Sequence, residues 1–199
     1  MKNFTTLFAR LVLALTLATG AGAAMAVPAS YHFTIDTAKF APGSGYLELT
    51  FLGYADSAAA TAVISNFTGG ANEASIIDGT AAGDLGTSVT LTGSGFNLVD
   101  QLINFGSMIN FDVLFDFADV GNTTGFAAQF YNTDFSAYAA VSGPFASVLV
   151  TPGTGTAATT SAGFVTVSEN AAAVPEPGQW VLMLTGLLLL GAIARRRSM

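Results

Sequence analysis

The run from Ile109 to Phe117 alternates apolar and polar side chains over nine residues. Asn110, Asp112 and Asp116 separate its apolar positions, and Leu114 is the one exception to the alternation. Successive side chains of a strand point to opposite faces, so this run predicts a half-buried strand with one face in a core. No long stretch between the two ends of the chain has the periodicity of an amphipathic helix. The chain is therefore expected to be all-β.

Shorter runs of the same kind predict seven more strands, separated by pieces rich in glycine and proline. Short strands at this spacing favour an antiparallel β-sandwich or jelly-roll-like fold, and no internal repeat suggests another architecture. The stretch Thr151–Ala162, rich in threonine, glycine and alanine, is expected to be a loop. The seven further strands are predicted at Tyr31–Ile35, Leu47–Phe51, Thr61–Phe67, Ser88–Leu91, Phe126–Tyr131, Ser147–Val150 and Phe164–Val167.

The first 26 residues have the composition of a signal peptide. Lys2 and Arg10 precede a short apolar run, and small residues follow it with an A-x-A pattern at Ala24 and Ala26. A basic region, an apolar stretch too short to span a bilayer and an A-x-A site are typical of a secretory signal. Cleavage after Ala26 would leave a mature chain that begins at Val27.

The C-terminal end combines a proline-rich motif, an apolar segment and a basic cluster. The prolines predict an extended segment, since they do not fit inside a helix. The apolar segment, Trp180–Ala194, is fifteen residues long and would measure roughly 23 Å as a helix, short of a hydrocarbon core of about 30 Å. The arginines stop translocation and keep the C-terminus in the cytoplasm. The motif is Val174, Pro175, Glu176 and Pro177, and the membrane stop is Arg195, Arg196 and Arg197.

This order of features resembles the PEP-CTERM sorting signal, over about the last 26 residues. The resemblance implies recognition by an integral-membrane exosortase, which would cut near residues 175–177 and release or transfer the protein. It also implies a Gram-negative bacterium that makes extracellular polysaccharide. The expected precursor is anchored in the inner membrane, and the expected product is at the cell surface or in the extracellular matrix. An ordinary C-terminal membrane anchor is the alternative.

The segment between the two signals is strongly acidic. Residues 27–177, which include Glu176 of the motif, hold all thirteen acidic residues and one basic residue, Lys39, which gives a net charge of −12. A nucleic-acid partner is excluded, because phosphates require lysine and arginine. Neutral sugars and divalent cations would not be repelled. By length the segment is one β-sandwich domain, expected at 27–167, with a linker at 168–174 and the sorting signal at 175–199.

No catalytic set stands out in this segment, so no catalytic residue is predicted. The chain has no cysteine, which excludes thiol catalysis and cysteine-based metal sites. His32 is the only histidine and is expected on the solvent face of its strand, and no G-x-S-x-G motif is present. Asp112 and Asp116 share one face but lie about 13 Å apart at roughly 3.3 Å per residue, too far for a glycosidase pair. Acids from neighbouring strands could still approach one of them.

Aspartates and asparagines near predicted strand ends could supply calcium ligands, although turn-forming hydrogen bonds are the usual role of such residues. No cofactor is expected, and calcium is the one candidate. The weak calcium candidates are Asp119, Asn122, Asn132 and Asp134.

Four tyrosines of the mature segment could form a sugar-binding face, or could fill the edges of a sheet. The sequence thus favours a non-enzymatic exported protein of the cell surface or of an exopolysaccharide-rich (biofilm) matrix. A carbohydrate-binding module, with or without calcium, is the alternative, and a glycoside hydrolase-like enzyme is the third. The four tyrosines are Tyr46, Tyr54, Tyr131 and Tyr138.

Overall fold

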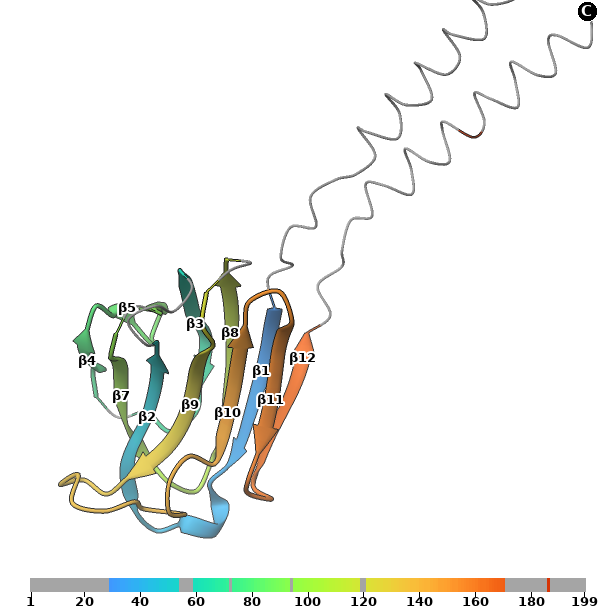
Figure 1. Cartoon of the computed structure of the whole chain (residues 1–199). Coiled ribbons are helices and arrows are strands. Elements are labelled where there is room, and N and C mark those ends of the chain that lie inside the picture. The colour runs from blue at the N-terminus through green and yellow to red at the C-terminus, as the bar shows by residue number, and fades with distance from the viewer. Residues whose placement is uncertain are drawn as a thin grey trace, which may run out of the picture. The chain divides into compact units, whose positions relative to one another are not determined.

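The structure of this chain, a computed structural model, describes residues 29–53, 59–71, 73–93, 95–118, 121–170 and 186. The described residues between 29 and 170 belong to one compact unit that is almost entirely β (Figure 1). Its elements are twelve strands and a 3₁₀-helix, η1 (Ala38–Phe40). The strands form two antiparallel sheets of six, which confirms the all-β, antiparallel prediction.

Sheet A has the strand order β12-β1-β8-β3-β6-β5, and sheet B has the order β11-β10-β9-β2-β7-β4. The strands of sheet A are β1 (Ala29–Asp36), β3 (Ala60–Thr68), β5 (Ala82–Asp84), β6 (Ser88–Thr92), β8 (Met108–Phe117) and β12 (Val165–Asn170). The strands of sheet B are β2 (Ser44–Leu52), β4 (Ile76–Gly79), β7 (Asn97–Asn104), β9 (Thr124–Tyr131), β10 (Ala146–Thr151) and β11 (Gly155–Thr160).

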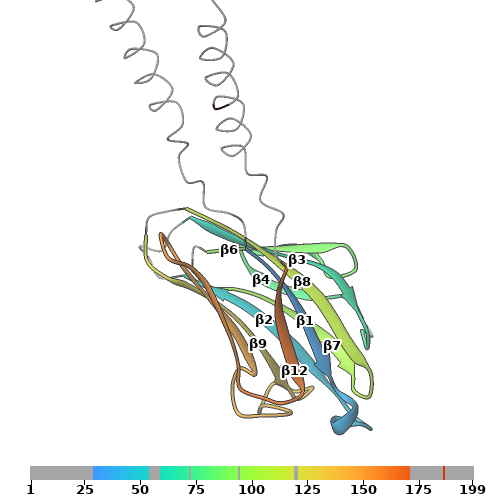
Figure 2. The ribbon, with the colours of Figure 1, turned by 90° about the vertical axis from the view of Figure 1, so that its right-hand side faces the viewer.

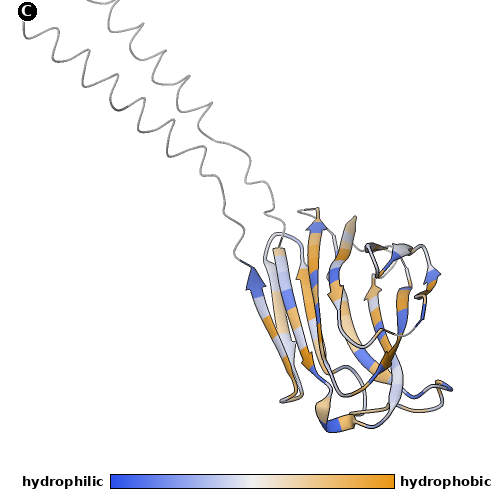
Figure 3. Cartoon of the chain, turned by 180° about the vertical axis from the view of Figure 1, so that it is seen from behind, coloured by the Kyte–Doolittle hydropathy of each residue, from blue (hydrophilic) through white to orange (hydrophobic). Residues whose placement is uncertain are grey.

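The two sheets lie face to face (Figure 2), and their inner faces share one phenylalanine-rich core. The Phe33 ring of β1 lies 5.6 Å from the Phe126 ring of β9, and the Phe115 ring of β8 lies 5.9 Å from the Phe51 ring of β2. All four side chains are fully buried. Each such burial stabilises the fold by about 1.5–3 kcal/mol. Hydrophobic and hydrophilic positions alternate along the strands, so one face of each sheet is left for solvent (Figure 3).

All eight strands predicted from alternation are present, but four others were not predicted. The prediction of a loop over Thr151–Ala162 is wrong, because β11 pairs with β10 within it. Most of β11 is exposed, and an edge strand with no buried face needs no apolar alternation. The remaining unpredicted strands are β4, β5 and β7.

The strand β12 continues through Ser168, Glu169 and Asn170, three residues that the sequence placed in the linker. It runs antiparallel to β1, and Ser30 pairs with Asn170. Backbone pairing to β1 therefore extends the folded domain to the end of the described segment, and the first and last strands lie side by side.

The predicted signals at the two ends of the chain lie outside the described residues, except for residue 186. Among the residues that the structure describes, no helix has the length and apolar character needed to cross a membrane. The sequence predictions that fall outside are the cleavage residues Ala24, Ala26 and Val27, the motif Val174–Pro177 and the arginines Arg195–Arg197.

Candidate functional site

The outer face of sheet B brings three tyrosines into one row. Tyr46 of β2 is directly opposite Tyr131 of β9, and Tyr131 forms a β-bridge with Tyr138. The Tyr131 and Tyr138 rings are stacked, with centroids 4.9 Å apart. Tyr46 faces outward because Leu47, its neighbour along β2, takes the core position. Three of the four sugar-face candidates are thus together, and Tyr54 lies outside the described residues.

A phenylalanine from the loop after β9 completes this group. The Phe135 ring stacks on Tyr46 with centroids 4.4 Å apart and lies 6.0 Å from the Tyr131 ring. The backbone of Phe135 is left-handed, with φ of 58°, a conformation that costs a non-glycine residue about 1–2 kcal/mol. Phe135 and Tyr138 are nevertheless 42% and 43% exposed. We call Tyr46, Tyr131, Phe135 and Tyr138 the aromatic cluster.

Hydrogen bonds of the loop hold Phe135 in this conformation. Asp134 Oδ1 accepts a bond from the Ser136 amide at 2.9 Å, and Asn132 Nδ2 donates to Ser136 Oγ at 2.9 Å. Asn132 Oδ1 accepts a 3.3 Å bond from the Ala137 amide. The Ser136 hydrogen bonds lower the pKa of Asp134. Asn132 and Asp134, two of the calcium candidates, therefore build the turn that presents an aromatic ring.

The other two calcium candidates lie elsewhere. Asn122 is exposed between β8 and β9, and Asp119 lies outside the described residues. Within the described ranges, no three or more histidine, aspartate and glutamate side chains are grouped as a metal site requires.

Two carboxylates that the sequence did not single out lie beside the aromatic cluster. Glu48 of β2 is directly opposite Asp100 of β7 and, on its other side, Gln129 of β9. The Gln129 side-chain amide donates a hydrogen bond to Glu48 Oε1. Asp100 is only 6% exposed, and its buried Oδ1 has no hydrogen-bond partner among the described residues. Burial and, secondarily, the negative charge of Glu48 raise the pKa of Asp100 to about 7.

The carboxylates and the aromatic cluster belong to one surface. Glu48 and Tyr46 are two residues apart on β2 and point to the same side of the sheet. The pKa of Tyr131 is raised to about 12, mainly by the hydrogen bond with Tyr138, and the charges of Glu48 and Asp100 add to the effect. We call this surface the tyrosine–carboxylate face; it consists of the aromatic cluster with Glu48, Asp100 and Gln129.

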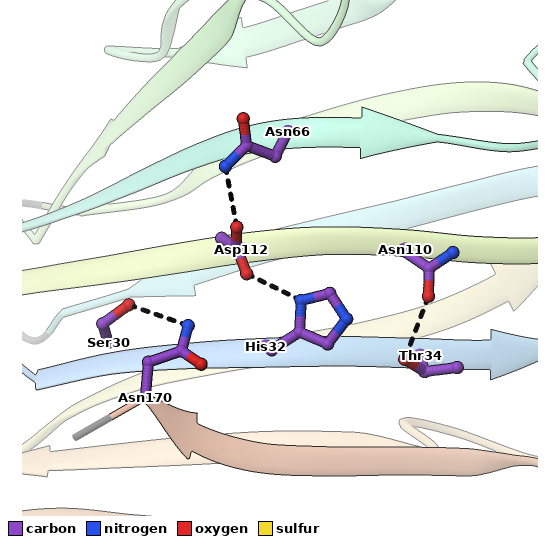
Figure 4. Close-up of polar contacts among 7 residues, drawn as sticks. All are labelled: Ser30, His32, Thr34, Asn66, Asn110, Asp112 and Asn170. Carbon is purple, nitrogen blue, oxygen red and sulfur yellow. Dashed lines mark hydrogen bonds and ion pairs between the residues drawn. The ribbon is translucent and has the colours of Figure 1, made fainter.

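A second polar cluster lies on the outer face of sheet A (Figure 4). His32 Nδ1 of β1 lies 2.7 Å from Asp112 Oδ1 of β8, and Asn66 Nδ2 of β3 donates to Asp112 Oδ2 at 2.8 Å. The Asn66 hydrogen bond lowers the pKa of Asp112, and His32 contributes to the same effect. The His32 side chain is 40% exposed, which confirms its predicted place on the solvent face.

This second cluster joins strands rather than forming a catalytic triad. Ser168 of β12 is opposite His32, so an aspartate, a histidine and a serine lie on three neighbouring strands. The second ring nitrogen of His32 points along β1 toward Thr34 (Figure 4), and no hydrogen bond links it to Ser168 among the described contacts. Asp116 shares the outer face of β8 with Asp112, as predicted, and is exposed.

Comparison with protein-family models, curated proteins and solved structures found no match for the chain. The chemistry of the tyrosine–carboxylate face therefore rests on its geometry alone.

Proposed function

We propose that this protein is an exported, non-enzymatic protein of the cell surface or polysaccharide matrix, and that its tyrosine–carboxylate face binds a glycan. The exposed aromatic cluster carries the proposal. The C–H faces of pyranose rings pack against aromatic rings, while carboxylates and amides bond to sugar hydroxyls. The strained loop at Phe135 presents a ring at the cost of stability, which is typical of binding sites.

The proposed architecture is a β-sandwich of the jelly-roll type. Its support is the nested pairing in which β1 pairs with β8, β2 pairs with β7 and β3 pairs with β6. Contact between β3 and β8 then closes sheet A. A strand ribbon wrapped in this way is the arrangement of jelly rolls, a fold that includes lectin domains. The fold supports glycan binding only by analogy, and the face supplies the argument for function.

A glycoside hydrolase is the competing function, because Glu48 and Asp100 are directly opposed across two strands. Such positions bring Cβ atoms to about 4.5–5.5 Å, and retaining glycosidases hold their carboxyl groups about 5–5.5 Å apart. However, both carboxyl groups of a glycosidase must reach the scissile bond, whereas Asp100 is almost completely buried. Binding is therefore the better interpretation. Incubation with β-glucan and amino-sugar oligomers should release no reducing ends, and catalytic release that Glu48→Gln abolishes would establish the hydrolase instead.

Glycan binding is proposed to be independent of calcium, because Asn132 Oδ1 and Asp134 Oδ1 already accept hydrogen bonds within their loop. The test is binding of purified protein to the exopolysaccharide of its own cells, with and without a calcium chelator. Tyr46→Ala and Phe135→Gly should weaken binding at least about tenfold, given that a stacking aromatic contributes about 0.5–1.5 kcal/mol beyond its buried area. Leu114→Ala, an exposed change on the outer face of sheet A, is the matched control. Equal binding by all variants would refute the site.

The proposed route of export is the PEP-CTERM tail, with an exosortase, the export machinery and the inner membrane as transient partners. Deleting residues 175–177 should leave the full-length protein in the inner membrane. Normal release of the deletion variant would contradict the sorting proposal without affecting the glycan proposal.

A further inference from the structure

We infer that the glycan bound by the tyrosine–carboxylate face is basic, a polysaccharide of amino sugars with free 2-ammonium groups. This inference rests on the proposed function, and it names the ligand class of that same face. This class of glycan is inferred from three features of the face: its charge, the unsatisfied oxygen of Asp100 and the position of the carboxyl groups beside the aromatic rings.

The charge of the domain selects among classes of polysaccharide. Residues 27–177 carry thirteen acidic residues against Lys39 alone, and Lys39 lies in η1 rather than on a strand of sheet B. Glu48 and Asp100 add two carboxyl groups to the face itself, and neither forms a salt bridge with any of the described residues. Uronic-acid and sulfated glycans would be repelled, and a cationic glycan would be attracted.

The buried carboxyl of Asp100 lies beside Glu48 with one oxygen unsatisfied. Its Oδ1 has no hydrogen-bond partner among the described residues, although 94% of the residue is shielded from solvent. A buried acceptor without a partner is costly, and the negative charge of Glu48 disfavours the charged form of Asp100. An ammonium group bound at Glu48 would donate up to three hydrogen bonds there and would offset the charge of Glu48, which in turn favours ionisation of the Asp100 carboxyl beside it. A neutral sugar hydroxyl would supply hydrogen bonds but no charge.

The distance between the carboxyl groups and the aromatic cluster matches the size of one sugar residue. Tyr46 and Glu48 are two residues apart on the same side of β2, a spacing of about 7 Å. A pyranose ring stacked on the aromatic cluster can therefore direct a ring substituent to Glu48. Gln129 gives one amide hydrogen to Glu48 and fixes its orientation. Nearby aromatic faces also attract an ammonium group directly.

The experiment compares hexamers of β-1,4-linked glucosamine, N-acetylglucosamine and glucose by calorimetry at pH 6. The full chain is used, in a detergent whose headgroup contains no sugar. The glucosamine hexamer should bind at least about tenfold more tightly than the other two, because charge-assisted hydrogen bonds are roughly twice as strong as neutral ones. Glu48→Gln should remove this preference, because it keeps the shape of the side chain without the charge. Asp100→Asn should reduce the preference less, because the raised pKa of Asp100, about 7, leaves this carboxyl mostly protonated at pH 6. Asp116→Asn removes the same charge from the exposed outer face of sheet A and should change nothing.

Each other result has a separate meaning. Equal binding of the three hexamers through Tyr46 would overturn the inference and leave the proposed function standing. Binding of the glucosamine hexamer that Asp116→Asn weakens as much as Glu48→Gln would show general attraction to an acidic protein and would overturn the inference. Equally tight binding of poly-lysine would do the same, because it needs no sugar. No binding of any hexamer, together with no binding of the native exopolysaccharide, would refute both the inference and the proposed function.

Discussion

Replacing Asp100 with asparagine should remove a loss of stability that the wild-type domain undergoes as pH rises. Burial and the charge of Glu48 raise the pKa of Asp100 from its ordinary value of 3.8 to about 7 in the folded protein. Between these two values the folded state holds a proton that the unfolded state has released. The stability from this group is therefore fully present below about pH 4 and is lost as pH rises through about 7.

The size of this effect follows from the shift. A rise of roughly three pKa units corresponds to about 4 kcal/mol at 1.36 kcal/mol per unit. Glu48 is only half-buried, so water screens its share of the repulsion and relaxation around Asp100 reduces the rest. We expect about 2 kcal/mol to be lost by the wild-type domain between pH 4 and pH 8, relative to the asparagine variant. That is a large part of the stability of a small domain.

Urea unfolding of residues 26–172 at several pH values measures this difference. The core residues that the structure describes all belong to this segment. The chain's one tryptophan, Trp180, lies outside it, so unfolding is followed by circular dichroism. Asp100→Asn places an amide in a buried position and shifts stability equally at every pH, so the slopes are compared rather than the absolute values. Asp116→Asn, which removes an exposed charge, should keep the wild-type slope. If the unfolding free energies of wild type and Asp100→Asn ran parallel as a function of pH, the conclusion that the folded protein raises the pKa of Asp100 would be refuted.

Three further variants test other parts of the structure. Phe135→Gly should weaken binding of the glucosamine hexamer, while the free energy of unfolding changes by less than about 1 kcal/mol because glycine adopts φ of 58° without strain. A large loss of unfolding free energy would contradict this. Asp112→Asn should cost less than about 1 kcal/mol in unfolding free energy at pH 7, since the group is solvent-screened. Because the folded pKa is lowered, this cost should begin to fall as pH drops below the ordinary value of 3.8 and should be gone once pH is below the folded pKa; a cost that does not change as pH falls from 7 through the acid range would argue for a different role. Phe126→Ala should cost about 3–5 kcal/mol in urea unfolding, and a cost below 1 kcal/mol would contradict the shared core of the two sheets.

Much of the fold was predictable because most strands have one face in the core. In β8 the alternation of buried and outward positions is regular, and the sequence pattern matches it except at Met108 and Leu114, which are apolar but exposed. The edge strand β11 could not be found in this way. Its residues are mostly exposed, its pairing with β10 uses backbone groups, and its side chains carry no pattern that distinguishes it from a loop.

The strand β7 shows a different failure. Its residues come in pairs, Leu98 and Val99, Asp100 and Gln101, Leu102 and Ile103, and this breaks the period of two on both faces. The inner face then buries Gln101, which bonds to Ser75 at 2.9 Å, and the outer face buries Asp100. The buried polar residues thus remove the apolar–polar alternation from which this strand could have been predicted.

The candidate site could not be predicted from the sequence for two reasons: one of its residues is a buried polar residue, and its members come from strands that are distant in sequence. The available signal for Asp100 is that the polar pair Asp100 and Gln101 lies between two apolar pairs, because such a segment is buried and an acid within it has a perturbed environment. That signal identifies one member but not its partners. Glu48 and Gln129 approach Asp100 only through the pairing of β2 with β7 and with β9, and strands so distant in sequence have no local pattern that fixes their order. The aromatic cluster depends on the same pairing, so the tyrosines could be nominated from the sequence, whereas the carboxylates that give the face its charge could be recognised only once the strand order was known.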